Sequence, residues 1–334
     1  MAAEVILDVR DLRAYYRILK GDVKAVDGVT FQVRRGEILG IAGESGCGKS
    51  VTAQSILQLI PSPPGKITNG EIIFNGDNIL NKNEREMQKI RGNSIGMIFQ
   101  DPMTYLNPVL SIATQVTENL RLHKGMTREQ AMKRAVELFH LVGIPEPEIR
   151  LKQYPHQFSG GMRQRVMIAM ALACEPKLII ADEPTTALDV TVQAQILELL
   201  KELKDRFQTA VILITHDLGV VAGQADRILV MYAGQIVECG TLDAVLKKPS
   251  HPYTWGLLKS VPRLDAAKGQ KLTPIWGQPP DLLQDFTSCP FMPRCDYAMG
   301  ICAREMPPYF NGGKVRCWLN HPQAPKVEFK KEVS

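Results

Sequence analysis

The segment from Gly43 to Ser50 constrains the fold of this chain more than any other. It reads Gly-Glu-Ser-Gly-Cys-Gly-Lys-Ser, follows the apolar run Glu37 to Ala42, and precedes a helix predicted from Ser50 to Ile60. Its glycines allow successive backbone N–H groups to face phosphate oxygens, while Lys49 neutralises phosphate charge and the Ser50 hydroxyl ligates Mg²⁺. A plain glycine-rich turn is the alternative, but the flanking strand and helix favour an α/β nucleotide-binding fold.

A second segment that favours phosphate runs from Phe158 to Arg165, Phe-Ser-Gly-Gly-Met-Arg-Gln-Arg. Its Ser-Gly-Gly step opens a predicted helix, whose first N–H groups and positive end suit an anion. The chain therefore has two such segments but only one phosphate-loop lysine, Lys49. This combination predicts that ATP is held between two subunits.

Two carboxylates end the predicted buried strand Leu178-Ile179-Ile180-Ala181-Asp182-Glu183. In phosphoryl transfer, Asp182 would enter the Mg²⁺ shell and Glu183 would orient or deprotonate the attacking water. An ordinary strand end is the alternative interpretation. The phosphate loop upstream favours the catalytic one.

Composition narrows the class of protein. The 334 residues are 45% hydrophobic, which suffices for a full core, and the net charge of +5 is dispersed. No lysine or arginine cluster indicates nucleic acid as a partner. No apolar run reaches the roughly 18 to 20 residues that span a bilayer, so we expect a cytosolic protein whose membrane role comes through a partner.

Hydrophobic periodicity predicts an α/β chain interrupted by helices. A helical insertion is expected at about residues 103–173, where Thr127 caps one helix. We expect the first domain to span residues 1–250 and a second to span residues 251–334, where proline and glycine are dense. The predicted strands are Val5–Val9, Val29–Val33, Glu37–Ala42, Ile72–Phe74, Ile95–Phe99, Lys177–Ala181, Ala210–Ile214, Asp226–Tyr232 and Gln235–Glu238, and helices are predicted at Val190–Phe207 and up to Lys248.

Cysteines gather in the second predicted domain, where Cys289, Cys295, Cys302 and Cys317 follow the spacing C-x5-C-x6-C-x14-C. This spacing is looser than the close pairs of a structural zinc site and suits the larger body of a [4Fe–4S] cluster. Zinc and no metal remain alternatives, and a structural role is expected over a redox role. Cys47, within the phosphate loop, is either an oxidisable thiol or a small residue that fits there.

With these motifs the chain resembles the ATP-binding-cassette (ABC) ATPases. Phe158 to Met162 resembles the signature Leu-Ser-Gly-Gly-Gln, with Phe first and Met last and Ser159, Gly160 and Gly161 intact. In that family two cassettes pair head to tail, and each signature closes over the ATP of the other. The resemblance implies further roles: Gln100 as sensor of Mg²⁺ and catalytic water, Ala187-Leu188-Asp189 as D-loop, His216 as switch histidine, and Tyr16, or else Tyr15, stacked on adenine.

A narrower resemblance points to the importers of dipeptides, oligopeptides and nickel. It rests on Phe99 to Pro108, Tyr154 to Gln157, His251 to Thr254, and the tail Gly277 to Asp281 leading into Cys289-Pro290-Phe291-Met292-Pro293-Arg294-Cys295. The implied function is an ATPase subunit that powers peptide import. Alternatives are a nickel or small-sugar importer, a soluble ABC ATPase of cluster assembly, DNA repair or translation, or a redox-sensing interaction protein.

The resemblance also implies fold, ligands and partners. The expected fold has a mixed-sheet core, an antiparallel β subdomain, the helical insertion and a small irregular metal-binding extension. The expected partners are a second ATPase subunit, either a paralogue or a copy of this chain, two membrane permease subunits and, indirectly, an extracytoplasmic binding protein, at the cytoplasmic face of the plasma membrane. The expected ATP and Mg²⁺ residues are Tyr16, Gly43, Glu44, Ser45, Gly46, Cys47, Gly48, Lys49, Ser50, Val51, Gln100, Ser159, Gly160, Gly161, Asp182, Glu183, Asp189 and His216.

Overall fold

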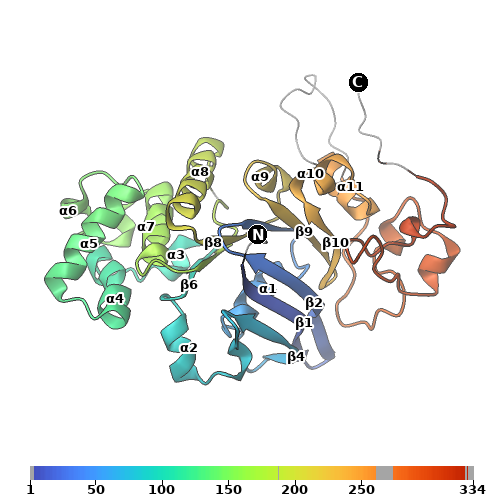
Figure 1. Ribbon diagram of the computed structural model, residues 1–334, viewed down its shortest axis with the longest axis horizontal. Coiled ribbons are helices and arrows are strands. Elements are labelled where there is room, and N and C mark those ends of the chain that lie inside the picture. The colour runs from blue at the N-terminus through green and yellow to red at the C-terminus, as the bar shows by residue number, and fades with distance from the viewer. Residues whose placement is uncertain (1–3, 187, 261–273, 328, 330–334) are drawn as a thin grey trace. The chain divides into compact units, whose positions relative to one another are not determined.

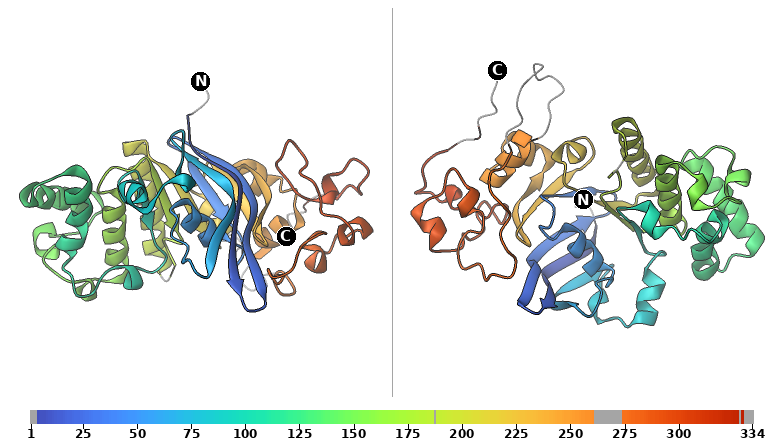
Figure 2. Two further views of the ribbon diagram at one scale, coloured as in Figure 1. Left: turned by 90° about the horizontal axis from the view of Figure 1, so that it is seen from below. Right: turned by 180° about the vertical axis from the view of Figure 1, so that it is seen from behind.

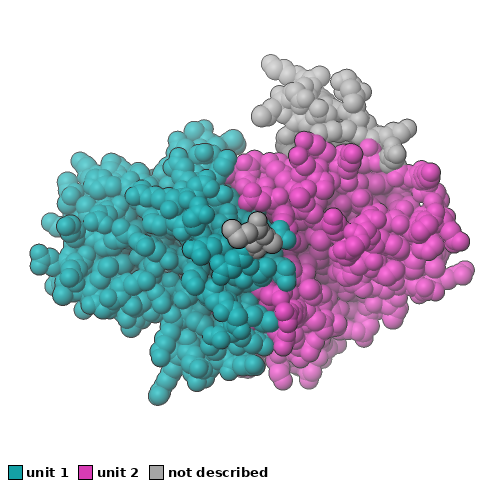
Figure 3. All heavy atoms as spheres, viewed as in Figure 1, with its two compact units in different colours: residues 1–7, 32–38, 73–214 teal, residues 8–31, 39–72, 215–334 magenta. Residues whose placement is uncertain are grey.

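The computed structural model describes residues 4–186, 188–260, 274–327 and 329. The chain divides into two compact units (Figure 3). Unit 1 comprises residues 1–7, 32–38 and 73–214, and unit 2 comprises residues 8–31, 39–72 and 215–334. The chain passes between them several times, so each unit is assembled from separate segments.

Unit 2 contains a mixed sheet that carries the phosphate loop. Strands β10 (Gln235–Thr241), β9 (Arg227–Tyr232) and β3 (Ile38–Ala42) lie in that order, with β10 antiparallel and β3 parallel to β9. All residues of β3 are buried, as expected for a strand with apolar side chains on both faces. The phosphate loop follows β3 directly and leads into helix α1 (Lys49–Ile56).

Most of the long strands β1 (Val5–Ile18) and β2 (Gly21–Arg34) also belongs to unit 2. A two-residue connection joins them, so they form an antiparallel hairpin, and β4 (Gly65–Phe74) lies on the other side of β1. The remaining helices of this unit are α9 (Leu218–Ala222), α10 (Leu242–Lys247) and α11 (Pro252–Ser260). After residue 274 the described chain is irregular apart from short 3₁₀ turns at 292–294, 300–303 and 318–320 (orange to red in Figure 2).

Unit 1 contains three parallel strands that carry the acidic residues. Strands β8 (Ala210–Thr215), β7 (Leu178–Asp182) and β6 (Ile95–Ile98) are adjacent in that order, and their carboxyl ends meet at one edge. Helix α8 (Val190–Phe207) follows β7. Near its start, unit 1 holds β5 (Asp77–Asn78), paired antiparallel with the end of β4, and helix α2 (Glu84–Ile90).

Helices fill the region of unit 1 between β6 and β7. They are α3 (Pro102–Tyr105), α4 (Ile112–Lys124), α5 (Arg128–Leu141), α6 (Pro147–Arg150) and α7 (Gly160–Leu172). Helices α4 and α5 pack on each other and on α7, which in turn packs on β6 (Figure 1). Thr127 forms a capping box with Gln130 at the start of α5, as predicted. Helices α3 to α7 thus occupy the range in which the helical insertion was expected, and its assignment as a subdomain stays a prediction.

The predicted domain division at residue 250 is not tested by these observations and stays a prediction. The predicted strands and helices recur, with α8 matching its predicted bounds. Strands β1 and β2 are each 14 residues long and exceed the prediction, and α2 and α11 were not predicted. These elements carry polar or aromatic residues that obscure their periodicity.

Candidate functional site

The phosphate loop of unit 2 adopts a conformation that depends on its glycines. Gly43 has φ +155° and Gly48 has φ +104°. A Cβ atom would lie 2.3 Å from the Met231 carbonyl oxygen at Gly43 and 2.1 Å from the Ala25 carbonyl oxygen at Gly48, so neither position admits a side chain. The sequence prediction of a tightly curled loop is confirmed for these glycines.

Lys49 is buried at the start of α1, and its ammonium group faces the loop. Its Nζ donates hydrogen bonds to the backbone oxygens of Gly43 at 2.8 Å and Glu44 at 2.9 Å. Ser50 lies half-buried in the first turn of the same helix, followed by Val51. The Lys49 ammonium and the Ser50 hydroxyl thus lie at the start of α1, where the backbone N–H groups of the helix are also available. This arrangement suits phosphate.

Two residues from distant segments of unit 2 support the loop at Glu44. The backbone N–H of Glu44 donates to Tyr253 Oη at 2.8 Å, and Arg294 donates two hydrogen bonds to the Glu44 carboxylate at 2.6 and 2.8 Å. This carboxylate raises the pKa of Arg294 above its ordinary value. Tyr253 and Arg294 belong to motifs that supported the importer resemblance, but their contacts could not be predicted from the sequence.

Cys47 is buried beneath the loop. Burial raises the pKa of its thiol to about 11, so the thiol is protonated at neutral pH. A protonated, buried thiol is a poor nucleophile. This observation favours the interpretation of Cys47 as a small residue that fits, over the oxidisable thiol.

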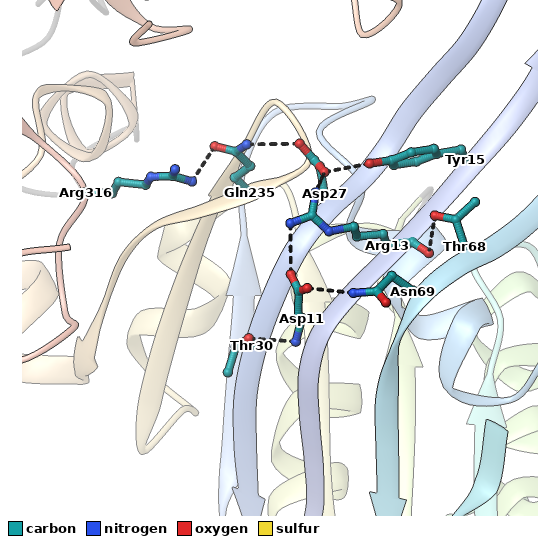
Figure 4. Close-up of polar contacts among 9 residues, drawn as sticks. All are labelled: Asp11, Arg13, Tyr15, Asp27, Thr30, Thr68, Asn69, Gln235 and Arg316. Atoms are coloured by element: carbon teal, nitrogen blue, oxygen red, sulfur yellow. Dashed lines mark hydrogen bonds and ion pairs between the residues drawn. The ribbon is translucent and has the colours of Figure 1, made fainter. Parts of the chain in front are cut away.

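Tyr15 and Tyr16 are neighbours on β1, so their side chains point to opposite faces. Tyr15 donates a hydrogen bond through Oη to Asp27 at 2.8 Å, within a polar network that includes Arg13 and Gln235 (Figure 4). Tyr16 is half-buried, and burial raises the pKa of its hydroxyl. Because the network engages Tyr15, Tyr16 is the better candidate for stacking on adenine, and this role stays a prediction.

The acidic residues of unit 1 lie at the carboxyl ends of adjacent parallel strands. Asp182 is buried at the end of β7, and Glu183 follows with φ +46° and an N–H that donates to the Ile214 oxygen at 3.0 Å. Glu183 Oε2 accepts hydrogen bonds from Gln100 Nε2 at 3.1 Å and from Thr186 Oγ1 at 3.0 Å. The structure thus brings Gln100 to Glu183, and it adds Thr186, which the sequence analysis missed.

A positive φ at a non-glycine residue is sparsely populated and is concentrated at functional sites. Glu183 has this conformation at the end of a strand, and its carboxylate is partly exposed. The amide of Gln100 and the hydroxyl of Thr186 orient this carboxylate. An oriented carboxylate can accept a proton from, or position, a water molecule.

The signature segment of unit 1 forms the start of α7. Ser159 is the N-cap, with Oγ accepting from the Met162 N–H at 3.3 Å, and Ser159 and Gly160 are exposed. Gly161 lies against α8, because a Cβ atom there would approach Val192 Cγ1 to 2.8 Å. Because Ser159 accepts the Met162 N–H, the N–H groups of Gly160 and Gly161 are those that this helix start can offer to an anion.

Asp189 caps α8 by accepting the Val192 N–H at 2.9 Å. Leu188 of the predicted D-loop is described, whereas Ala187 lies outside the described residues. His216 is exposed in unit 2 directly after β8, next to a turn in which Thr215 Oγ1 accepts the Asp217 N–H at 3.1 Å. The roles of Asp189 and His216 stay predictions.

The four cysteines of the extension come near one another. The Cys289 N–H donates to the Cys302 oxygen at 3.1 Å. Burial, with smaller contributions from the neighbouring cysteines, raises the pKa of the Cys295 thiol to about 11 and that of Cys317 to about 12. Nevertheless, within the described part of the chain no group of three or more histidine, cysteine, aspartate or glutamate side chains is placed to hold a metal ion. The structure therefore does not support the expected metal-binding extension.

Residues 26–186 match the ABC transporter family model, and residues 237–302 match the model of the oligopeptide/dipeptide transporter C-terminal region. Among solved structures, the dimeric ATP-binding cassette MJ0796 bound to ADP and Pi has a TM-score of 0.64 at 32% identity, covering 71% of this chain and 98% of that one. The cbiO1 protein of Clostridium perfringens, part of the ABC transporter complex cbiONQ, has a TM-score of 0.63 at 29% identity, covering 73% of this chain and 91% of that one. The fold and the site define an ABC ATPase.

Relatives define the family more narrowly. The oligopeptide transport ATP-binding protein OppD of Bacillus subtilis is 56% identical over 97% of this chain and 91% of its own length. The dipeptide transport ATP-binding protein DppD of the same organism is 53% identical over 96% of each chain, and the Escherichia coli OppD is 53% identical over 94% of this chain and 93% of its own. The chain belongs to the family of oligopeptide and dipeptide transport ATP-binding proteins. Of its described helices, none has the length and apolar character needed to cross a bilayer.

Proposed function

We propose that this chain hydrolyses ATP to power the import of dipeptides or oligopeptides through an ABC permease. The single observation that carries the ATPase function is the Glu183 carboxylate, oriented by Gln100 at 3.1 Å and Thr186 at 3.0 Å at the edge of a parallel sheet. The peptide substrate class rests on the relatives, whose names assign them to oligopeptide and dipeptide transport.

In the proposed mechanism each residue acts on one part of the reaction. Glu183 accepts a proton from the attacking water or orients it, and Lys49 neutralises charge on the β- and γ-phosphates. His216 contacts the γ-phosphate. The hydroxyl of Ser50, the carboxylate of Asp182 and the amide oxygen of Gln100 would hold Mg²⁺, which prefers such hard oxygen ligands and, when bound, would neutralise charge on the phosphates.

The proposal includes a head-to-tail pair of ATPase subunits. Ser159, Gly160 and Gly161 would contact the ATP bound to the phosphate loop of the other subunit, and Asp189 would lie at the seam between the subunits. Support comes from the exposed start of α7 and from the dimeric cassettes among the structural neighbours. The pair would act on two permease subunits at the cytoplasmic face of the membrane, with an extracytoplasmic binding protein supplying the substrate.

The test of the catalytic assignment is Glu183→Gln. This variant keeps the shape of the side chain but removes the proton acceptor, so we expect ATP binding to persist and turnover to fall by about 10²- to 10⁴-fold, the usual contribution of a general base. Glu202→Gln on the exposed face of α8 is the matched control and should hydrolyse ATP at the wild-type rate. Normal hydrolysis by Glu183→Gln would overturn the role of this carboxylate.

Peptide import is tested separately from hydrolysis. The chain, expressed together with candidate ABC permease subunits, should copurify with them. Peptides should then stimulate ATP turnover of the reconstituted complex. Stimulation by nickel chelates or small sugars instead would reassign the substrate class. An active ATPase that never associates with a permease would refute the transport function while leaving the ATPase assignment intact.

We further propose that Cys289, Cys295, Cys302 and Cys317 ligate a structural [4Fe–4S] cluster. Support comes from the spacing of the four cysteines and from the Cys289 N–H, which donates to the Cys302 oxygen at 3.1 Å and brings two of them together. In the described part of the chain these side chains do not converge on a single metal ion. A [4Fe–4S] cluster takes its ligands from around a larger body than a single ion does, so we prefer the cluster to zinc. Iron, zinc and sulfide analysis of anaerobically purified protein decides: four irons and four sulfides per chain are expected, and zinc alone would refute the cluster.

A further inference from the structure

Arg294 connects the cysteine-bearing extension to the phosphate loop within unit 2. It directly precedes Cys295, its side chain is only 3% exposed, and its guanidinium donates to both carboxylate oxygens of Glu44 at 2.6 and 2.8 Å. The remaining donors are also engaged, since Nε donates to the Trp276 oxygen at 3.0 Å and Nη2 to the Ile275 oxygen at 3.3 Å. A planar guanidinium held on several sides has a fixed orientation.

The residue that Arg294 holds is central to the loop. The Glu44 backbone oxygen accepts from Lys49 Nζ at 2.9 Å, and its N–H donates to Tyr253 at 2.8 Å. Fixing the Glu44 side chain therefore fixes the peptide groups that orient the Lys49 ammonium. A movement of Glu44 would displace the lysine that neutralises phosphate charge.

Packing is incomplete on the side of the phosphate loop that faces Pro280 and Leu282. A cavity of about 20 Å³ separates it from the extension, and the cavity is lined by Glu44, Ser45, Gly46, Tyr232, Pro280 and Leu282. Such a volume is close to that of one water molecule. At this gap the hydrogen bonds from Arg294 to Glu44 help to hold the loop in place of apolar contacts.

A second arginine of the extension is connected to strand β1 by a separate route. Arg316 directly precedes Cys317 and donates to Gln235 Oε1 at 2.8 Å, and Gln235 Nε2 donates to Asp27 Oδ2 at 3.3 Å (Figure 4). Asp27 in turn accepts from Tyr15 on β1, the strand that carries Tyr16. Arg294 thus contacts the phosphate loop directly, whereas Arg316 is connected through Gln235 and Asp27 to the strand that carries Tyr16.

We propose that the extension is part of the nucleotide-binding apparatus, with Arg294 as the positioning residue that holds Glu44, and through it the phosphate loop, for ATP. This inference rests on the proposed ATPase function. It extends that function because it gives the cysteine-bearing segment a role in ATP affinity, independent of whether the cysteines bind a metal.

The test compares Arg294→Met, Arg294→Lys and Arg304→Met in the full-length protein. Met keeps the stem of Arg294 but leaves the Glu44 carboxylate without its partner, whereas Lys keeps the charge without the two-pronged contact. Arg304 is an exposed arginine of the same extension and serves as the matched control. The KM and kcat for ATP hydrolysis and the Kd of ATP by calorimetry are measured for each.

For Arg294→Met we expect the Kd and KM for ATP to rise about tenfold with kcat changed less than about twofold, and a smaller rise for Arg294→Lys. Arg304→Met should bind ATP as the wild type does. In a double-mutant cycle, Arg294→Met combined with Glu44→Gln should raise the Kd by less than the product of the single effects, because Arg294 acts through Glu44. If Arg294→Met does not fold, Arg294→Lys and Glu44→Gln carry the same comparison.

Wild-type ATP affinity in a folded Arg294→Met protein, or a lowered thermal stability with unchanged Kd, would overturn the positioning role. Independent effects of Arg294 and Glu44 in the cycle would overturn it as well. Failure of the wild-type chain to bind ATP would instead refute the proposed function itself, so the two failures are distinguishable.

Discussion

At the residue scale, the two glycines of the signature segment differ in what surrounds them. A Cβ atom at Gly161 would lie 2.8 Å from Val192 Cγ1, whereas one at Gly160 would meet Leu188 Cδ2 at 3.6 Å, an ordinary contact. Val192 is β-branched and cannot turn aside without cost. Gly161 is thus required for the packing of α7 on α8, and Gly160 is not.

We therefore predict that Gly161→Ala lowers the free energy of unfolding by about 1–3 kcal/mol, the usual cost of overpacking. Gly160→Ala should leave stability unchanged or raise it slightly, because alanine is the better helix former. Gly160→Ala should nonetheless reduce ATP turnover if its backbone approaches the phosphates of a partner subunit. Urea unfolding and turnover assays of both variants measure this, and equal destabilisation by the two would contradict the packing argument.

Residues at strand ends could be predicted, and residues that act through distant contacts could not. Asp182 and Glu183 end an apolar run, and Gln100 follows another, so their approach at the sheet edge follows from parallel pairing. The contact between Arg294 and Glu44 joins residues 250 positions apart. Since no periodic pattern encodes such a pair, only the folded structure reveals it.

At the element scale, the same contrast separates buried strands from amphipathic ones. Strands β3 and β7 were predicted because they are runs of apolar residues, followed in β7 by Asp182, and the structure buries all their residues. The hairpin strands β1 and β2 alternate irregularly and include several charged residues, so only their apolar portions were recognised. Polar pairs across the hairpin, such as Arg13 with Asp27 at 2.7 Å, complete the strands and are invisible to hydrophobic periodicity.

Helix α11 depends on a buried neutral histidine at its start. His251 Nδ1 accepts the N–H of Tyr253 at 3.0 Å, and burial lowers the pKa of His251 to about 3. Protonation would remove this acceptor and place a positive charge at the positive end of a helix. Because the pKa is lower in the folded state than the ordinary 6.5, the unfolded state binds the proton first, and stability falls as the pH drops below 6.5.

Between pH 7 and pH 5 we expect the free energy of unfolding of the wild type to fall by about 2 kcal/mol because of His251. The His251→Asn variant should not show this decrease. The buried Glu238, which accepts the His251 N–H, has a raised pKa and acts in the opposite direction, so the difference between the two proteins is the quantity to measure. Urea unfolding at both pH values provides it. The control variant His140→Asn, at an exposed position, should lose as much unfolding free energy between pH 7 and pH 5 as the wild type does. Equal decreases in the wild type and in His251→Asn would contradict the role of His251.

At the scale of the whole molecule, the chain carries one set of the proposed ATPase residues together with an extension. Identity to the oligopeptide transport relative extends over 97% of the chain, so cassette and extension occur in one polypeptide there too. A chain with one phosphate loop and one signature can complete two ATP sites only by pairing. The pairing is testable through two variants that damage opposite halves of a site.

Lys49→Ala removes the phosphate-loop cation, and Ser159→Arg blocks the signature with a bulky charge, so each protein alone should be inactive. In a mixed pair, one site retains Lys49 of one chain and Ser159 of the other, while the second site lacks both. In an equal mixture that pairs at random, half of the pairs are mixed, and one of the two sites in each mixed pair is intact. The mixture should therefore reach up to about one quarter of wild-type turnover. Mixed pairs that form, as judged by crosslinking, yet remain inactive would contradict sites shared between chains. If the wild-type chain alone is inactive, the working pair is expected to include a paralogue. Ser159→Arg in this chain, and an arginine at the matching serine of the paralogue, should then be tested one at a time. The variant that abolishes turnover identifies the signature that serves the intact phosphate loop.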